Sequence, residues 1–596
     1  MSVRVWAAVS VALILVAASL SAQGTPAPRP GGVVGAPAPG QPSLPRRDTT
    51  QKPATGTARI RGRVTAAPGG APLRRVRLTL QTPAGPEFTK VVMTDAQGRY
   101  EFSSLPAGRY SLSASKAAYV GLQYGQRRPF ESGTAIVLRD NETLASVDFA
   151  LPRGSVISGR VSDEFGEPLP QVQVEAQRFQ YTPEGRRRLV TSGTATTDDR
   201  GEFRIYGLMP GEYVVSGSVR SSFSSPFSAN GVFVGGSEPT ESYPPTFYPG
   251  TPNAAAAQRV SLGLAEELSV QFGLVAGRFA RLSGIARTSN GQPAYPAEVS
   301  LLPRQSAFDS GFSGSSRGTN PDGSFTVAGV APGEYTLDVR PSFFPQPGGR
   351  EAAGESGSLA VTVGSDDISG LQITTSKGAL VSGRVVWEGT SERTTPLITG
   401  PLRVLASSAD PSASALGFLT DPDAEGVLDD EGRFRMGGVK GQFHLDVSSS
   451  PNWILKSITV DGRDVTDVPL EMGDRASLDG VVITLTDKLT TVAGAVTDSR
   501  GAMATDYAVV IFPAEERDSI GRFFYYYIRT ARPDINGRFE TRGLRPGRYV
   551  AVALESLEQG RQYAPEFRQQ LRRGAREFTL KEGESLTLDL RIGTGF

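Results

Sequence analysis

One stretch of about sixteen residues occurs five times and constrains the fold more than any other feature. Its pattern is Asp/Asn-x-x-Gly-x-aromatic, followed by Gly-Leu-x-Pro-Gly-x-Tyr. The copies are Asp95–Tyr110, Asp198–Tyr213, Asn320–Tyr335, Asp429–Phe443 and Asp534–Tyr549. They lie roughly 100–120 residues apart, which is the length of a whole domain and not of a solenoid repeat.

The repeated stretch predicts a strand, a turn and a second strand. Asp198 and Gly201 suit a turn, because Asp bonds to its own backbone and Gly accepts a positive φ. Phe203 and Ile205 then alternate with polar residues, as in a half-buried strand. Pro210-Gly211 fits the centre of a type II turn, and alternation resumes at Tyr213.

The end of the stretch is similar to the tyrosine corner of Greek-key sandwiches, in which a Tyr hydroxyl bonds the backbone a few residues upstream. This predicts a structural role for Tyr110, Tyr213, Tyr335 and Tyr549. The fourth copy lacks the Pro, is one residue shorter and ends in Phe443, which has no hydroxyl. We expect its corner to be looser.

Each repeat is preceded by a strand with a central Gly. These strands are 60–64, 157–161, 282–286, 381–385 and 492–496. A turn and an alternating strand follow, then the repeated hairpin, then a closing alternating strand such as 144–151 or 586–592. About seven short strands per module is typical of a β-sandwich.

With opening strand, hairpin and closing strand in register five times, the chain resembles the carboxypeptidase regulatory-like domain. The resemblance implies a transthyretin-like β-sandwich, related to Cna protein B-type and starch-binding folds. The expected fold class is therefore all-β, a tandem array of about five Greek-key modules. The resemblance implies no peptidase activity, because this sandwich serves many functions.

The predicted boundaries follow from composition. Residues 1–22 resemble a secretory signal peptide, with Arg4 before an apolar run and small residues before a cut near Gln23. Residues 23–56 form a Pro/Gly-rich linker. The predicted modules are 57–152 (module 1), 153–278 (module 2, with a long loop at 217–260), 279–376 (module 3), 377–488 (module 4) and 489–596 (module 5). We expect an exported bacterial protein of the periplasm, outer surface or medium.

Composition excludes several classes of function. The formal net charge of +1 gives no sign of nucleic-acid binding. The absence of cysteine excludes disulfides, thiolate nucleophiles and Cys-ligated metals. No span after the signal peptide is apolar enough to cross a membrane.

Carbohydrate binding would need exposed aromatic platforms. The candidates are Tyr243, Phe247 and Tyr248 in the 217–260 segment, and Trp453. The alternative is that these Pro-flanked aromatics cap the sandwich. The aromatic run 523–528 has rings on both strand faces, so one face is expected in the core and the other against a neighbouring module or in a contact patch. Residues 451–467 add a hairpin with an Asp-Gly turn.

Calcium is a weaker candidate. Asp421, Asp423, Glu425 and Asp429 follow the first nine positions of an EF-hand loop, but Gly432 stands where a bidentate Glu belongs. Much of this run is also the turn of the repeat. We therefore predict neither a metal nor any cofactor.

Enzyme hypotheses lack their parts. His444 is the only histidine, and it follows a core Phe on a predicted strand. Without a second His or any Cys, neither nucleophilic triads nor a His-ligated zinc can be assembled. Carboxylates are plentiful in the repeat turns, and nothing singles out a glycosidase pair.

The sequence thus favours a non-enzymatic, exported scaffold or interaction array at the cell envelope. Its partners would be polysaccharides or envelope proteins. The alternative is carbohydrate binding through the module 2 aromatics. An accessory region of a peptidase or glycosidase system is the third hypothesis. No catalytic residue is predicted.

Overall fold

The computed structural model describes residues 56–82, 85–182, 185, 187–219, 241–304, 316–341, 355–391, 402–409, 425–447, 452–473, 476–515, 527–534 and 536–593. Residues from Ala54 onward belong to one compact unit. The signal peptide and linker predictions lie outside the described residues. The division into five modules stays a prediction, and the module numbers serve below as names for the residue ranges.

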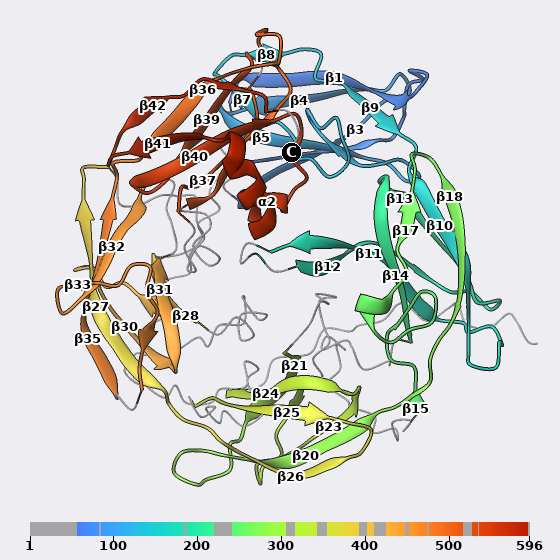
Figure 1. Ribbon diagram of the computed structural model, residues 1–596, viewed down its shortest axis with the longest axis vertical. Helices are drawn as coiled ribbons and strands as arrows, with labels where there is room; N and C mark the ends of the chain where they lie inside the picture. The colour runs from blue at the N-terminus through green and yellow to red at the C-terminus, as the bar shows by residue number, and fades with distance from the viewer. Residues whose placement is uncertain are drawn as a thin grey trace, which may run out of the picture. The chain divides into compact units, whose positions relative to one another are not determined.

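The described chain is almost entirely β-strand, and most of its strands form pairs of sheets that follow the predicted modules (Figure 1). In module 1 the sheets are β4-β1-β8, with β9 also on β1, and β3-β2-β5-β6, with β7 also on β5. The bounds are β1 Ala58–Ala67, β2 Arg77–Thr82, β3 Gly85–Met93, β4 Arg99–Leu105, β5 Gly108–Ser115, β6 Leu122–Gln123, β7 Ile136–Leu138, β8 Thr143–Leu144 and β9 Phe149–Pro152.

Module 2 repeats this plan with the sheets β13-β10-β18 and β12-β11-β14-β16, and β17 also pairs with β14. A two-stranded sheet, β15-β19, is added. The bounds are β10 Ser155–Ser162, β11 Val172–Tyr181, β12 Arg187–Thr196, β13 Glu202–Leu208, β14 Gly211–Val219, β15 Glu241–Ser242, β16 Thr246–Phe247, β17 Val260–Leu262, β18 Glu267–Gly273 and β19 Gly277–Arg278.

Module 3 has the sheets β23-β20-β26 and β22-β21-β24-β25. The bounds are β20 Ala280–Arg287, β21 Ala297–Pro303, β22 Ser316–Gly318, β23 Ser324–Val330, β24 Gly333–Pro341, β25 Gly357–Val363 and β26 Ile368–Thr374.

Module 4 has the sheets β30-β27-β35-β32-β33 and β29-β28-β31-β34. The bounds are β27 Ala379–Glu388, β28 Arg403–Ser408, β29 Glu425–Val427, β30 Arg433–Val439, β31 Gln442–Val447, β32 Ile454–Val460, β33 Arg463–Asp464, β34 Leu470–Glu471 and β35 Ser477–Thr486. Strands β32 and β33 are the predicted extra hairpin.

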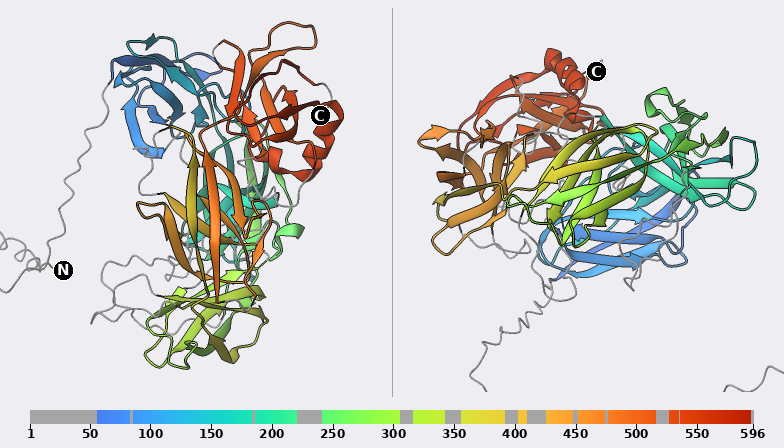
Figure 2. Two further views of the ribbon diagram at one scale, coloured as in Figure 1. Left: turned by 90° about the vertical axis from the view of Figure 1, so that its left-hand side faces the viewer. Right: turned by 90° about the horizontal axis from the view of Figure 1, so that it is seen from below.

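Module 5 has the sheets β39-β36-β42, with β43 also on β36, and β38-β37-β40-β41. The bounds are β36 Thr491–Thr497, β37 Ala508–Pro513, β38 Arg529–Ala531, β39 Arg538–Arg542, β40 Gly547–Leu554, β41 Arg576–Leu580, β42 Ser585–Thr587 and β43 Leu590–Arg591. A 3-10 turn (η5, Arg561–Tyr563) and a short helix, α2 (Pro565–Leu571), follow β40 (Figure 2).

The opening strand has the same neighbours in each range. In module 2, β10 pairs antiparallel with β13 of the repeated hairpin and parallel with the closing strand β18. The same arrangement holds for β1, β20, β27 and β36. The repeated hairpin therefore places one strand in each sheet: β13 joins the sheet of β10, and β14 joins the sheet of β11.

The central Gly of the opening strand is explained by this packing. A Cβ on Gly159 would lie 1.8 Å from the carbonyl oxygen of Val270, closer than any side chain allows. Phe203, the aromatic of the repeat, is the cross-strand partner of Gly159 and is buried. The aromatic ring covers the space that the missing side chain leaves. Corresponding Gly–aromatic pairs are Gly62–Tyr100, Gly284–Phe325, Gly383–Phe434 and Gly494–Phe539.

The hydrophobic cores differ in how far they extend. Modules 1, 2 and 3 each have a cluster of buried side chains drawn from both of their sheets. Modules 4 and 5 instead share one continuous cluster that runs from Ala379 to Leu590. The contact between these two consecutive modules is therefore part of a core.

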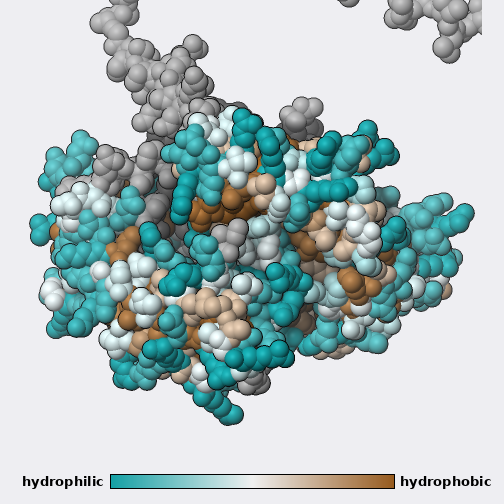
Figure 3. All heavy atoms as spheres, turned by 90° about the horizontal axis from the view of Figure 1, so that it is seen from above, coloured by the Kyte–Doolittle hydropathy of each residue, from teal (hydrophilic) through white to brown (hydrophobic). Residues whose placement is uncertain are grey.

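The face drawn in Figure 3 shows hydrophobic residues as separate groups among hydrophilic ones. No helix in the described residues is both long and apolar enough to span a bilayer.

Candidate functional site

The Asp residues that recur in the repeat bind their own turns. Asp198 Oδ1 accepts the backbone N–H groups of Arg200 (3.0 Å) and Glu202 (2.8 Å). Asp95, Asp429 and Asp534 accept the equivalent pairs of N–H groups. Hydrogen bonds from the Arg99 and Arg433 backbone lower the pKa of Asp95 and Asp429, respectively. These carboxylates shape hairpins and are not arranged around a common point.

The four tyrosines of the repeat have the geometry of a tyrosine corner. Each hydroxyl donates to the backbone carbonyl four residues upstream. The bonds are Tyr110–Pro106 (2.7 Å), Tyr213–Met209 (2.6 Å), Tyr335–Ala331 (2.9 Å) and Tyr549–Arg545 (2.8 Å). Burial raises the pKa of Tyr213 to about 12, so this hydroxyl keeps its proton. The four side chains tie the hairpin turn to the strand that follows it.

The described part of the 217–260 segment is not one open loop. Strand β16 pairs with β14 and carries Phe247, which is only 1% exposed. Tyr248 packs against the module 2 core and meets Phe272 edge to face, with ring centroids 6.4 Å apart. Phe247 therefore offers no free ring face to a ligand. Its burial fits the alternative that these aromatics cap the sandwich.

Tyr243, like Tyr248, is partly buried against the module 2 core. It is partly exposed, and its hydroxyl donates to Glu164 at 2.5 Å, across the turn that follows β10. This hydrogen bond raises the pKa of Tyr243 to about 12. Next to Glu164, Phe165 is 84% exposed at the tip of the turn. Of the three module 2 candidates, Tyr243 has the ring and polar partner that a sugar contact would need.

Trp453 lies inside module 4. It is 2% exposed and meets Trp387 edge to face, with ring centroids 4.8 Å apart. Its place just before β32 puts it in the core that modules 4 and 5 share. Trp453 is thus a packing residue and has no open face for a glycan.

Two of the four calcium candidates are described by the structure, and both have protein partners. Asp421 and Asp423 lie outside the described residues. Glu425 forms an ion pair with Arg403, and Asp429 caps its own turn and pairs with Arg433. Within the described ranges, no group of three acidic or histidine side chains is placed to hold a metal. His444 is buried on β31, where its backbone pairs with Ser407 of β28.

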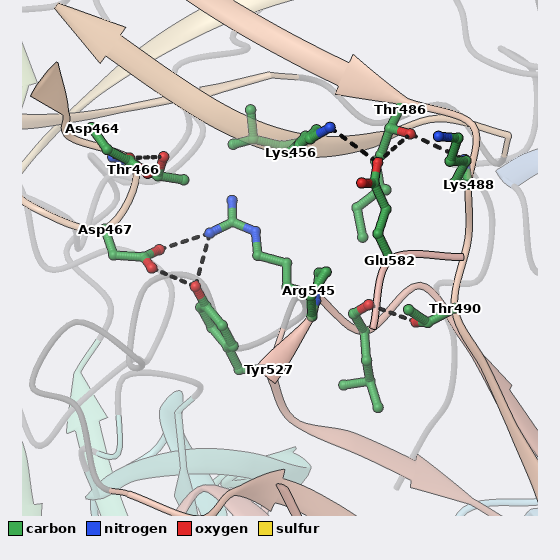
Figure 4. A pocket seen from close by; sticks show the side chains of 14 residues that line it. Lys456, Asp464, Thr466, Asp467, Thr486, Lys488, Thr490, Tyr527, Arg545 and Glu582 are labelled. Atoms are coloured by element: carbon green, nitrogen blue, oxygen red, sulfur yellow. Dashed lines mark hydrogen bonds and ion pairs between the residues drawn. The ribbon is translucent and has the colours of Figure 1, made fainter. Parts of the chain in front are cut away.

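A cavity lined partly by polar side chains lies between the extra hairpin of module 4 and module 5 (Figure 4). Its volume is about 250 Å³. One wall comes from β32 and the residues after β33, and the other from the segment between β39 and β40. We call this region the 4–5 seam.

Three side chains at the seam form a closed hydrogen-bonded set (Figure 4). Arg545 Nη1 donates to Asp467 Oδ1 at 2.7 Å and to the Tyr527 hydroxyl at 2.9 Å. The Tyr527 hydroxyl in turn donates to Asp467 Oδ2 at 2.5 Å. Burial raises the pKa of Tyr527, so the phenol stays protonated and acts as a donor. Arg545 is buried, and its charge is neutralised across the module boundary.

A second ionic group lines the other side of the cavity. Lys456 Nζ contacts Glu388 at 2.6 Å and Glu582 of module 5 at 3.2 Å. The hydrogen bond to Glu388 raises the pKa of Lys456, and the Lys456 ammonium lowers the pKa of Glu582. Thr486 also donates to Glu582, at 3.3 Å.

These arrangements join modules and do not activate a nucleophile. Asp467 pairs with Arg545 and Glu582 pairs with Lys456, in both cases across the module boundary, so both carboxylates take part in contacts between modules. The sequence pointed to two parts of this site, the aromatic run that ends in Tyr527 and the extra hairpin. It gave no signal for Arg545, whose position inside the Leu-Arg-Pro-Gly turn looks like an exposed variable residue.

Comparison with known families identifies two stretches of the chain. Residues 59–152 and 156–239 match the carboxypeptidase regulatory-like domain. These ranges cover the predicted module 1 and most of module 2. No curated protein shows significant sequence similarity to the chain.

Several solved structures show local similarity at low identity. The TIE protein of Bacillus anthracis is 14% identical, with 54% of this chain and 51% of that one covered and a TM-score of 0.15. This chain thus spans about half the length of that protein. A streptococcal ancillary pilin is 12% identical, with 53% and 98% covered and a TM-score of 0.21. The minor pilin GBS52 of Streptococcus agalactiae is 16% identical, with 37% and 95% covered and a TM-score of 0.20.

Proposed function

Residues 59–152 and 156–239 belong to the carboxypeptidase regulatory-like domain family, and from this premise we propose that the protein is a non-enzymatic, exported scaffold whose β-sandwich modules contact envelope components. Two family domains at the start of the folded chain, and three further ranges with the same strand order, support a chain built by repeating a structural unit. Such arrays act through the surfaces they present and through the spacing they impose.

One observation carries the proposal. The polar residues that recur in four of the five copies have structural partners inside their own copy: the Asp carboxylates cap turns, and the Tyr hydroxyls bind backbone carbonyls. Residues that recur for catalysis would instead converge on a shared cavity. The charged residues at the 4–5 seam are specific to that boundary and join two modules.

Export is part of the proposal, and it rests on the apolar segment at residues 5–18 with Arg4 before it. The check is N-terminal sequencing of the protein recovered from the periplasm, cell surface or medium of the native cell. A start near Gln23 is expected. Recovery of a chain that begins at Met1 from the cytoplasm would contradict export.

The scaffold function is tested by incubating the purified mature chain with insoluble cell-envelope fractions. One sample of the envelope is treated with protease beforehand, and a second with glycan-degrading enzymes. We expect retention that the protease treatment abolishes, because the proposed partners are envelope proteins. No retention on any fraction would contradict a contact function, and release of soluble peptides or sugars would contradict a non-enzymatic one.

The same experiment distinguishes glycan binding from binding to envelope proteins. The Tyr243→Ala variant removes the accessible ring beside Glu164, and Tyr206→Ala removes another tyrosine of module 2, 54% exposed on β13. Retention that is lost with glycan removal and with Tyr243→Ala, but kept with Tyr206→Ala, would replace the scaffold proposal by glycan binding at Tyr243. Phe247 and Trp453 are unsuitable for this test, because their removal would open cavities in the cores.

A further inference from the structure

The segment from Gly125 to Glu131, between β6 and β7 of module 1, contacts module 5 although the two lie more than 400 residues apart in the chain. We call it the docking segment. Arg128 Nη1 donates to the backbone carbonyl of Glu555 at 2.5 Å. The Phe130 carbonyl accepts the N–H of Gln559 at 2.9 Å, and Glu131 and Glu558 form an isolated β-bridge. Module 5 thus binds the backbone of this segment as well as its side chains.

A buried ion pair lies at the centre of this contact. The Glu131 side chain is 1% exposed, and its carboxylate meets Arg532 of module 5 at 3.3 Å and Arg128 at 3.4 Å. Arg532, 11% exposed, also contacts Asp506 at 2.7 Å. A carboxylate this deeply buried is costly unless its charge is compensated. Arg128 supplies part of that compensation from within module 1, and Arg532 of module 5 supplies a second cation that undocking would remove.

Module 2 also takes part in the contact, chiefly through Arg178. The Arg178 guanidinium lies over the Phe130 ring, with Cζ 3.1 Å from the ring centroid, and forms an ion pair with Glu558. Arg178 is thereby in contact with module 1 and module 5 at once. Phe130 packs against the module 2 core, and Tyr181 of module 2 packs against the cluster around α2 in module 5. The beginning, the second range and the end of the folded chain meet at one junction.

The backbone of the docking segment carries strain in the same place. Phe130 has a φ of 61°, which is unfavourable for a bulky residue. In this conformation its ring reaches Arg178 while its carbonyl accepts from Gln559. Strain of this kind persists only where the surrounding contacts determine it. The contacts that do so come from two other modules.

We propose that the docking segment is an intramolecular binding element, whose partner is the module 5 surface formed by Asp506, Arg532, Glu555 and Glu558, and that its docking holds modules 1, 2 and 5 together in solution. The proposal concerns the arrangement of the array and is independent of what the array binds.

The test measures the distance between modules 1 and 5 in the full chain. The protein has no cysteine, so Val137→Cys in module 1 and Met503→Cys in module 5, both more than half exposed, accept spin labels selectively. Docking predicts one narrow distance distribution for the labelled parent. A broad distribution in the parent would overturn the proposal.

Two variants then ask whether the buried pair is responsible. Arg532→Met leaves the Glu131 carboxylate buried beside module 5 without the cation that module 5 provides, and we expect the distribution to broaden. Glu131→Gln with Arg532→Met removes both charges and keeps an acceptor for the Arg128 N–H, so we expect the narrow distribution to return in large part. A distribution that is unchanged in Arg532→Met, or as broad in the double variant as in the single one, would overturn the role of the pair.

A matched control keeps the result interpretable. Arg59→Met removes the cation of an exposed ion pair with Glu101 in module 1, away from the junction, and should leave the distribution unchanged. Hydrogen exchange of the β10 and β36 amides reports whether Arg532→Met still folds. Normal protection of both strands together with a broadened distribution would show undocking of intact modules.

Discussion

The 4–5 seam and the junction of modules 1, 2 and 5 hold the chain together by different means. At the seam, two consecutive modules share one continuous hydrophobic core, and the hydrogen-bonded set of Asp467, Tyr527 and Arg545 lies at its edge. At the junction, the cores of the three ranges remain separate clusters, and ion pairs, one cation–π contact and backbone hydrogen bonds join them.

A direct connection permits a shared core but does not impose one, because modules 1 and 2 are joined by the two residues between β9 and β10 and keep separate clusters. Residues 486–491 link the last strand of module 4 directly to the first of module 5, so their contact forms at high effective concentration and can grow into a core. Modules 1 and 5 must find each other across the intervening chain, and each must remain soluble while undocked. A polar docking surface meets that requirement, because it exposes little apolar area when it is open.

The largest expected effect comes from breaking the seam through its core. Trp453→Ala should lower the free energy of unfolding by about 3–5 kcal/mol, because it removes a buried aromatic and leaves a cavity. Since the core is shared, hydrogen exchange should increase in both module 4 and module 5. Phe165→Ala, at an 84% exposed tip, serves as the control and should change stability by less than about 0.5 kcal/mol. Loss of protection confined to module 4 would argue against a shared core.

A sharper comparison uses the two buried arginines, one from each contact. Arg532→Met should cost about 3 kcal/mol of docking free energy, because the Glu131 side chain, 1% exposed, cannot regain water without opening the junction. Arg545→Met should cost less, about 1–2 kcal/mol, because the Asp467 side chain is already 24% exposed and can be hydrated in place. Native-state hydrogen exchange of the docking segment and of β32 measures the two losses. The reverse order would mean that exposure of the remaining carboxylate does not set the cost.

The sequence predicts the repeated parts of the molecule far better than these contacts between modules. Counterparts of Gly159 and of the aromatic Phe203 occur in all five ranges, and counterparts of Tyr213 occur in three others, because each serves the backbone packing of its own module. Glu131 and Arg532 are not part of the repeated pattern. In an Arg-rich chain, their sequence context resembles that of solvated surface charges. Their pairing depends on the folded arrangement of segments more than 400 residues apart, and no local pattern encodes it.

The aromatic candidates show the same limit. Alternation with proline marked Phe247 and Trp453 as unusual, but local sequence cannot tell an exposed platform from a ring that covers a core. For Phe247, the short strand β16 explains the burial, because its pairing with β14 places the ring in the interior. Arg545, which the sequence analysis missed, is positioned by the tyrosine corner. Its carbonyl accepts the Tyr549 hydroxyl, while its side chain reaches Asp467 of module 4.

Because Arg545 has this double role, Tyr549→Phe should have a smaller effect than the arginine substitutions, and one that Tyr213→Phe should not share at the seam. Tyr549→Phe should cost about 1 kcal/mol for the lost hydrogen bond and should also loosen the seam, because the corner positions the Arg545 backbone. Tyr213→Phe removes the equivalent bond to Met209 and should cost a similar amount in module 2 without any effect at the seam. Urea unfolding measures the first quantity, and the amide exchange of β32 the second. Equal amide exchange at β32 in the two variants would show that the Tyr549 hydrogen bond does not affect the 4–5 seam.

The smallest expected effect is the response of the repeat turns to acid, and it should be alike on the two sides of the comparison. Asp95 in module 1 and Asp429 in module 4 are exposed, and backbone hydrogen bonds lower the pKa of both below the usual range of an Asp carboxyl group. A carboxyl group whose pKa is lower in the folded state stabilises that state above its unfolded pKa, and this contribution is lost as the pH falls through the folded pKa. The hairpins should therefore weaken only below about pH 4, as followed by the exchange or chemical shifts of the Arg99 and Arg433 amides.

Asn at either position provides the control. Asp95→Asn or Asp429→Asn keeps an oxygen that can accept the same two N–H groups, and the amide does not titrate. The local acid response should vanish in the substituted turn and persist in the other. Suppose that, with both turns substituted, acid still loosens one module at a clearly higher pH than the other. That result would place the source of the acid response in the contacts between modules, because the junction relies on charged side chains and the seam relies mainly on its core.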